Sequence, residues 1–200
     1  MKVALLGATG KAAARLIAEL TLRGHQVTGI ARKAGESDPG VPLVFADAND
    51  AAALAAAIEG HDALIVSARF VSIDAAAILD ALKQAGVPRI LVVGGAGTLE
   101  AAPGVLVIDL PNIPEAFLPE MRGGQAFLAA LKASDADWTF LSPAATFVPG
   151  ECTGRYRLGG DALMRDANGE SRISYEDLAK AMVDELEEPH HSRERFSIAY

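Results

Sequence analysis

The stretch KVALLGATGKAAARL, residues 2–16, decides the fold. Its apolar run Lys2–Leu6 has the composition of a buried β-strand, and the Ala-rich sequence from Lys11 onward has that of a helix. Between them, Gly7 and Gly10 leave room for a tight turn. The stretch therefore predicts a strand, a turn and a helix, which is the opening of a βαβ unit.

The turn has the features of a phosphate-binding loop. The first amides of the following helix are unpaired donors aligned with the helix dipole, so they stabilise a pyrophosphate. Ala13 stands at the third small position, where most dinucleotide fingerprints have glycine. An ordinary glycine-containing turn is the alternative interpretation, and a P-loop is excluded because no Gly-Lys-Ser/Thr sequence is present. The residues expected to contact a dinucleotide here are Gly7, Ala8, Thr9, Gly10, Lys11 and Ala12.

Outward from this stretch, short apolar runs alternate with longer Ala- and Leu-rich runs. Consecutive βαβ units produce this order, and strands covered by helices on both faces are apolar throughout. The expected strands are Lys2–Leu6, Gln26–Ile30, Val41–Phe45, Ala63–Ser67, Arg89–Val93, Trp138–Leu141 and Arg195–Tyr200. The expected helices are Lys11–Arg23, Ala51–Glu59, Ile73–Ala85 opened by Ser72, Pro119–Lys132, and one opened by Ser174, with Asp177 as a capping-box acid, that ends near Glu187.

These elements predict the α/β class, with a Rossmann-like, doubly wound and mostly parallel sheet flanked by helices. Residues 1–200 are expected to form a single domain, because no low-complexity linker divides them. The Gly-, Arg- and Asp-rich residues 143–171 predict an irregular C-terminal excursion on the substrate side.

The end of the second strand is the next diagnostic position, because an acid there binds a ribose diol and a base binds a ribose phosphate. Arg32 and Lys33 stand there, so the sequence favours NADP, with NAD as the alternative. The alternative interpretation is that Arg32 and Lys33 are two solvated surface cations without a role in binding. After the third strand, Asp47 and Ala48 are candidates for the adenine side, although Asp47 is equally typical of a turn.

Ligands of an open parallel sheet bind outside the carboxyl ends of its strands. The candidates at that edge are Ser67, Ala68 and Arg69, then Gly94 and Gly95, then Ser142, Pro143 and Ala144. Ser67 and Ser142 are candidates for contacting the nicotinamide or the acceptor, or else for satisfying local backbone groups. His25 and His61 precede strands and belong at the opposite edge, and no third ligand accompanies His190 and His191, so we expect no metal site. The acidic residues Asp184, Glu185, Glu187 and Glu188 are expected to form a solvated face.

Composition excludes several partners. The 26 acidic residues outnumber the 18 basic ones, which gives a formal charge of −8. The sequence also contains no Lys/Arg cluster of the kind that binds nucleic acid, so we expect no nucleic-acid partner. Cys152 is the single cysteine, which excludes an internal disulfide and fits a reducing compartment. The first apolar run is too short for a signal peptide or a membrane span, so we expect a cytoplasmic protein without a membrane anchor.

The chain resembles the atypical short-chain dehydrogenase/reductases with an NmrA-like NAD(P)H-binding domain, in particular their NADH-flavin-reductase-like branch. It is also similar to flavin reductases of the biliverdin reductase B type. The resemblance rests on residues 7–10, 92–99, 137–144, 153–157 and 173–179. It implies a dinucleotide across the strand ends, with Gly7, Thr9 and Gly10 at the pyrophosphate, Arg32 at the ribose phosphate and Asp47 at the adenine. It also implies that Ser67, Ala68, Gly94 and Ser142-Pro143-Ala144 surround the nicotinamide.

One departure concerns the chemistry. Typical members use a Tyr-x-x-x-Lys pair as proton donor, whereas Tyr156 is followed at that spacing by Gly160 and Tyr175 by Ala179. A flavin or another conjugated small molecule fits better as hydride acceptor, because its reduced form is protonated from water. The first hypothesis is therefore an NAD(P)H-dependent reductase of such acceptors, and the second is a non-catalytic NADP-binding redox sensor of the NmrA type. A sugar-nucleotide epimerase is a weaker third, and the oligomeric state stays open.

Overall fold

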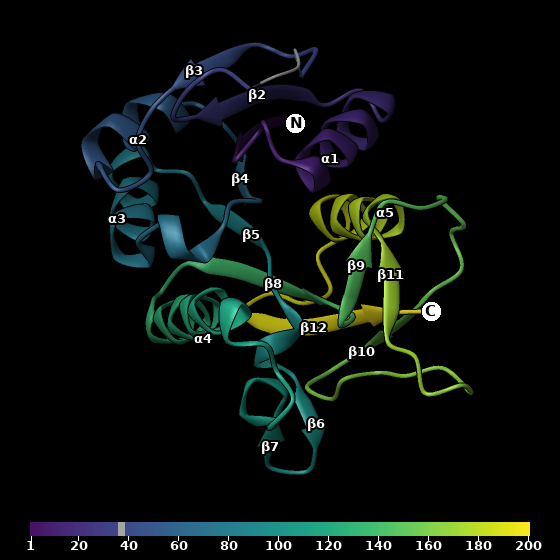
Figure 1. Ribbon diagram of the computed structural model, residues 1–200. Helices are drawn as coiled ribbons and strands as arrows, with labels where there is room; N and C mark the ends of the chain where they lie inside the picture. Colours follow the sequence, from purple (N-terminus) through teal and green to yellow (C-terminus); the bar gives the residue numbers. More distant parts are fainter. Residues whose placement is uncertain (36–38) are drawn as a thin grey trace.

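The computed structural model describes residues 1–35 and 39–200, and its centre is one sheet (Figure 1). Among the described residues this sheet has eight strands in the order β10-β12-β8-β5-β4-β1-β2-β3, all parallel to their neighbours except β10, which is antiparallel to β12. The strands are β1 (Lys2–Leu6), β2 (Gln26–Ala31), β3 (Leu43–Phe45), β4 (Ala63–Val66), β5 (Arg89–Val93), β8 (Asp137–Pro143), β10 (Arg157–Gly159) and β12 (Glu194–Ala199). Because β1 pairs with both β2 and β4, the strand order reverses there, and this switch point is where such sheets bind ligands.

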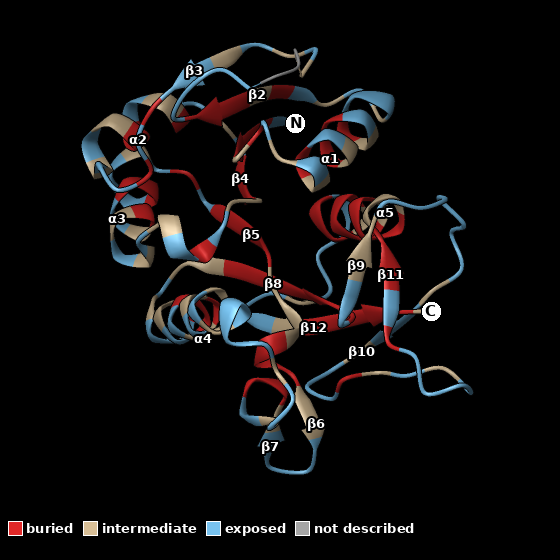
Figure 2. Cartoon of the chain, in the orientation of Figure 1, coloured by how far each residue is buried: buried red, intermediate tan, exposed pale blue. Residues whose placement is uncertain are grey.

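Helices cover both faces of the sheet. They are α1 (Lys11–Leu22), α2 (Ala51–Ile58), α3 (Ala75–Ala85), α4 (Leu118–Ala133) and α5 (Tyr175–Glu187). The side chains of α1 and α5 share one core with Leu5 and Ile65, whereas those of α2, α3 and α4 share another with Leu6 and Leu64. Successive strand residues point to opposite faces, so the inner strands are buried along their length (Figure 2). The predicted doubly wound α/β fold is confirmed.

Short elements surround the carboxyl ends of the strands. The 3₁₀ helices are η1 (Phe70–Ser72), η2 (Ala96–Thr98), η3 (Val107–Asp109) and η4 (Glu115–Phe117). A hairpin of β6 (Glu100–Ala102) and β7 (Val105–Leu106) projects from the body, and in the excursion β9 (Thr146–Val148) pairs in parallel with β11 (Arg172–Ser174) (Figure 1). Leu99, Val107 and Leu163 form a third small core that joins the hairpin to the excursion.

One helix start and one capping interaction differ from the sequence prediction. The third helix begins at Ala75 and is capped by Asp74, whose carboxylate accepts from the Ala76 amide, because Ser72 lies in η1 and donates to the Arg69 carbonyl instead. Ser174 does cap α5 by accepting from the Asp177 amide. The Asp177 side chain, however, does not complete the predicted capping box; it turns to Thr153, Gly154 and Tyr200.

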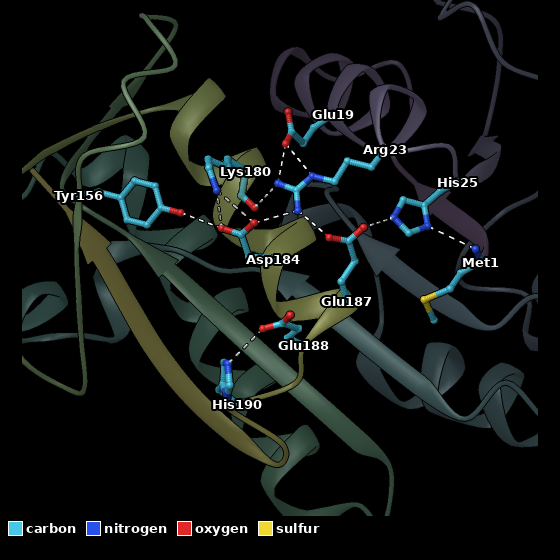
Figure 3. Close-up of polar contacts among 10 residues, drawn as sticks. All are labelled: Met1, Glu19, Arg23, His25, Tyr156, Lys180, Asp184, Glu187, Glu188 and His190. Carbon is cyan, nitrogen blue, oxygen red and sulfur yellow. Dashed lines mark hydrogen bonds and ion pairs between the residues drawn. The ribbon is translucent and has the colours of Figure 1, made fainter.

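The acidic end of α5 is not the solvated face that its sequence predicts. Asp184 bonds to Arg23, Lys180 and Tyr156, and Glu187 joins Arg23 to His25, so these side chains hold α1 against α5 (Figure 3). Only Glu188 fits the prediction well, with 82% of its side chain exposed.

Glu185 departs furthest from that prediction, because only 4% of its side chain is exposed. Its carboxylate lies 3.2 Å from the Arg89 guanidinium, itself 7% exposed, and 2.8 Å from His191 Nδ1. It also accepts from the amides of His190 and His191. The last turn of α5 is thereby fixed to β5. A helical pattern of acids does not reveal this, because the partners come from distant parts of the chain.

No helix within residues 1–35 and 39–200 combines the length and the apolar character that a membrane crossing requires. Over the same residues, no group of three or more His, Cys, Asp or Glu side chains is placed to hold a metal ion.

Candidate functional site

The turn after β1 brings two backbone segments into direct contact. Gly7 has a φ of +85°, and a Cβ there would lie 2.4 Å from the carbonyl oxygen of Ser67, which follows β4. The amides of Gly7 and Ala8 both donate to the carbonyl of Ile30 in β2, at 2.9 and 3.2 Å. The ends of β1, β2 and β4 are therefore fixed around one point, and only glycine fits position 7.

The N-terminus of α1 points at the same place. Gly10 is the N-cap and supplies no side-chain cap, and the amides of Lys11, Ala12 and Ala13 have no hydrogen-bond partner among the described residues. Ala13, at the third small position of the fingerprint, is fully buried. Its small side chain lets α1 pack closely on the sheet, as expected. Three unpaired amides at the positive end of a helix dipole form a binding place for an anion such as a diphosphate.

A cleft of about 220 Å³ opens at this switch point, and we call it the switch-point cleft. It brings together residues that follow four different strands, as the sequence predicts for the carboxyl edge of the sheet. Its lining consists of Leu6, Gly7, Thr9, Gly10, Ala31, Arg32, Ala48, Ser67, Ala68, Arg69, Ser72 and Ile73.

The surroundings of the cleft are basic although the chain is acidic. Arg32 lines the cleft, and Lys11 and Lys33 line a neighbouring hollow, the basic hollow, together with Ala8, Thr9 and Gly10. None of these three cations forms an ion pair with any residue that the structure describes, and no carboxylate lines either space. Cations and amides that have no partner among the described residues favour a ligand with several negative charges.

Asp47 occupies a turn at the edge of the cleft. Its Oδ1 accepts from the Asn49 amide at 3.0 Å, so the turn that its sequence allowed is present. Asn49, which sequence reasoning missed, donates from Nδ2 to the Ser72 carbonyl and accepts from the Asp74 amide. These bonds tie the loop after β3 to the loop after β4 and place the buried Ala48 in the cleft wall. The adenine role of Asp47 stays a prediction.

A second space of about 360 Å³, the apolar cavity, lies beside the loops after β5 and β8. It contains the predicted Gly94, Gly95, Pro143 and Ala144. It also contains residues that sequence reasoning missed, which come from three further segments: Phe70, Phe117, Glu120, Met121, Gly124, Ala145 and Phe147, with Ala96, Gly97 and Thr98 completing the wall. The loop after β4 joins the two spaces, because Arg69 lines the switch-point cleft and Phe70 the apolar cavity.

The glycines of the apolar cavity have different roles. A Cβ at Gly94 would lie 2.2 Å from the Phe140 ring, and one at Gly97 would lie 2.6 Å from Met121, so these two are required for packing. A Cβ at Gly95 would meet no atom within 4 Å, and Gly95 has a φ of −146°, which any residue adopts. Gly95 is therefore the cavity-lining glycine whose backbone and surroundings accept a Cβ without a clash.

The two serine candidates differ in access. Ser67 lines the switch-point cleft, and its hydroxyl has no hydrogen-bond partner among the described residues. Ser142 is fully buried, and its Oγ lies 3.3 Å from Thr98 Oγ1. Ser142 lines neither the switch-point cleft nor the apolar cavity, whereas Ser67 lines the cleft, and a ligand contact by either hydroxyl stays a prediction. Ala12 and Asp47 also line none of the three spaces.

None of the tyrosines lines these spaces in the described chain. Tyr175 packs edge-on against Phe147, and Tyr156 donates to Asp184. Burial and the neighbouring Asp184 carboxylate raise the pKa of the Tyr156 phenol above its ordinary value. Neither the switch-point cleft nor the apolar cavity therefore contains a phenol that could donate a proton to a ligand.

Asp177 ties the excursion to the start of α5 and to the C-terminal residue Tyr200. Its buried carboxylate accepts from the Thr153 hydroxyl at 2.7 Å, the Gly154 amide at 2.8 Å and the Tyr200 hydroxyl at 2.8 Å. Burial alone would raise the pKa of this carboxyl, but these hydrogen bonds outweigh it and hold the pKa below its ordinary value.

Comparison with known proteins agrees with this geometry. The model of a family described as NAD(P)H-binding matches residues 7–189. Among solved structures, a proposed exported protein from Burkholderia pseudomallei is 41% identical with a TM-score of 0.90, covering 100% of both chains. A proposed epimerase from Bacteroides thetaiotaomicron is 39% identical with a TM-score of 0.91, covering 100% of this chain and 96% of that one. A proposed NADH-flavin reductase from Streptococcus pneumoniae is 33% identical with a TM-score of 0.85, covering 100% and 99%.

Proposed function

The chain belongs to the NAD(P)H-binding family, and from that premise we propose that it is a reductase that transfers a hydride from NADPH to a flavin or a similar conjugated acceptor. The dinucleotide would lie across the switch-point cleft, with its diphosphate at the Gly7–Ala12 turn and its phosphorylated ribose at Arg32. The acceptor would occupy the apolar cavity. Membership of the NmrA-like branch within this family stays a prediction.

One observation carries the choice of acceptor, namely that the apolar cavity offers aromatic and backbone surface but no tyrosine, lysine or histidine among the described residues. Phe70, Phe117 and Phe147 contribute to its wall, and Glu120 is its one titratable side chain among the described residues. Reduction of a carbonyl needs an acid at the oxygen, whereas a reduced conjugated ring spreads the charge and takes its proton from water. A cavity of this kind therefore suits a flat conjugated ring.

The contribution of the protein would be positioning. Bound NADPH would supply two electrons and one proton as hydride, the acceptor would take a second proton from water, and NADP⁺ would remain. Ser67 and the small residues after β5 and β8 would hold the two rings in contact. Such orientation can lower a barrier by several kcal/mol without an acid or base.

We expect Arg32→Ala to weaken NADPH binding by roughly tenfold or more and to change NADH binding little, because a guanidinium–phosphate hydrogen bond is charge-assisted. Titration of both dinucleotides against both proteins measures this. Lys83→Ala is the matched control, because it removes one exposed cation from the last turn of α3, whose end is remote from the carboxyl edge. Equal losses of NADPH and NADH affinity would contradict the phosphate role.

We expect Gly95→Leu to reduce flavin turnover by roughly a hundredfold while NADPH affinity changes little, because the new side chain would enter the open apolar cavity. Steady-state NADPH oxidation with riboflavin or FMN, alongside dinucleotide titration, tests this. Gly160→Leu is the control, since a Cβ there also meets nothing within 4 Å but Gly160 lies outside the cavity. Full activity of Gly95→Leu would place the acceptor elsewhere.

The absence of tyrosine, lysine and histidine from the described lining also favours a second candidate, a redox sensor that binds NADP and catalyses nothing. Steady-state NADPH oxidation with riboflavin or FMN separates the two. Turnover supports the reductase, and tight dinucleotide binding without turnover on any acceptor supports the sensor. An epimerase, the description given to one similar structure, is disfavoured because no tyrosine lines the cavity in the described residues.

A cytoplasmic location also belongs to this proposal. Its support is the single cysteine Cys152, which is free and exposed. An exposed thiol persists in a reducing compartment.

A further inference from the structure

Resting on the proposed function, we propose that Glu120 determines which acceptors the apolar cavity takes. It would select a conjugated ring that presents an N–H donor at its edge, and it would disfavour a ring that carries negative charge or an alkyl group there. The inference rests on the position of this carboxylate, on its hydrogen bonds and on its surroundings.

Among the described residues, Glu120 is the one charged side chain in a largely apolar wall. It lies in the first turn of α4, and 32% of its side chain is exposed. The remaining lining of the cavity is aromatic, aliphatic or small, with the buried Thr98 hydroxyl turned to the Gly95 carbonyl at 3.0 Å. A polar group in such surroundings fixes the orientation of a ligand more strongly than any apolar neighbour.

The hydrogen bonds of Glu120 present it to the cavity as an acceptor. Oε1 accepts from the Phe70 amide at 2.8 Å and Oε2 from the Val71 amide at 3.3 Å, while Arg69 Nε lies 3.6 Å from Oε2. A carboxylate has about four lone-pair sites, so two backbone amides leave others available. Gly123 and Gly124 let α4 approach Phe70 closely, with a Cβ at Gly123 only 2.8 Å from the Phe70 Cβ, which fixes the carboxylate relative to the cavity.

These contacts imply selection by charge and by donor. An anionic ring edge would meet the negative charge of the carboxylate, which Arg69 at 3.6 Å and solvent over the exposed 32% of the side chain offset only in part. A ring edge that carries an N–H would donate to Glu120, whereas an N-alkylated edge would leave a partly buried carboxylate less well solvated. The isoalloxazine ring of a flavin has such an edge, the imide N–H of its pyrimidine part. The selected class is therefore a neutral ring with an imide or amide edge.

The test compares lumiflavin with 3-methyllumiflavin, which lacks that imide N–H. Steady-state NADPH oxidation gives kcat/KM, and quenching of flavin fluorescence on the NADP⁺-loaded protein gives the dissociation constant without turnover. In the wild-type protein we expect 3-methyllumiflavin to be weaker by roughly tenfold in both measurements, because a hydrogen bond to a charged acceptor is lost. In Glu120→Gln we expect the two flavins to differ by less than about twofold, because an amide offers a donor in place of a carboxylate oxygen.

Glu115→Gln is the matched control, because Glu115 is exposed in η4 and lies outside the cavity lining, so it should keep the wild-type discrimination. Thermal unfolding checks that Glu120→Gln folds. The comparison of the two flavins on the wild-type protein does not depend on this variant. Equal binding of the two flavins by the wild type, binding of neither, or full discrimination in folded Glu120→Gln would overturn the inference. Discrimination in binding without any NADPH oxidation would support the inference while contradicting the proposed reductase.

Discussion

Gly7→Ala is expected to weaken NADPH binding by at least about a hundredfold, because a methyl group at this position must displace the backbone that supports the turn after β1, where we propose that the diphosphate binds. The added Cβ would lie 2.4 Å from Ser67 O and 2.8 Å from Ser67 C, both backbone atoms that have no rotamer to adopt. The residue also has a φ of +85°, which costs an alanine about 1 kcal/mol or more. Calorimetric titration of the purified variant with NADPH measures the effect.

Gly24→Ala separates backbone strain from displacement of the turn. Gly24 has nearly the same φ, +81°, but a Cβ there meets nothing within 4 Å, and it follows the other end of α1. We expect this variant to lose about 1 kcal/mol of unfolding free energy and to bind NADPH like the wild type. Similar NADPH affinities for Gly7→Ala and the wild type would show that the turn does not form the dinucleotide site.

Glu185→Ala is expected to lower the free energy of unfolding by about 3–5 kcal/mol, the usual cost of removing one partner from a buried ion pair. The substitution leaves the Arg89 guanidinium, 7% exposed, without its buried counter-charge, and removes the acceptor of two backbone amides. Arg89 keeps its contact with Asp137 at 2.8 Å, but the Asp137 side chain is 43% exposed. Urea unfolding followed by circular dichroism measures the loss.

Glu188→Ala provides the comparison within the same stretch of acids. Its side chain is 82% exposed, and its one ion pair in the described chain is with His190 at 4.0 Å. We expect a change within about 0.5 kcal/mol. If both variants lost the same small amount, Glu185 would be on a solvated face as its sequence alone indicates, and the buried pair would contribute nothing to stability.

The fold follows from the sequence because its signals are local. Apolar strands such as Lys2–Leu6 and Ala63–Val66 are buried on both faces, and each is followed by a turn whose residues permit a helix start. The errors concern capping. Ser72 and Asp74 are both good N-caps by residue type, and the choice of Asp74 depends on η1, which Glu120 holds from α4 through the amides of Phe70 and Val71.

In the candidate site, too, the parts that depend on local sequence could be predicted and the parts that depend on distant contacts could not. The contacts around Gly7–Gly10, Arg32 and Ser67 could be predicted because each follows a strand, and parallel strands end at one edge. The wall of the apolar cavity that Phe70, Met121 and Phe147 form could not be predicted, because these residues belong to segments that meet only in the folded chain. One signal was present but not used, namely Gly123-Gly124 within a helical stretch, where the missing side chains let α4 rest on Phe70.

The central claim is that a nicotinamide dinucleotide binds at the switch-point cleft, with its diphosphate on the amides of Lys11, Ala12 and Ala13 that have no partner among the described residues. Isothermal titration of the wild-type protein with NADPH and with NADH tests it directly. The account predicts saturable binding of one dinucleotide per chain, tighter for NADPH than for NADH. The absence of saturable binding with both dinucleotides would contradict it.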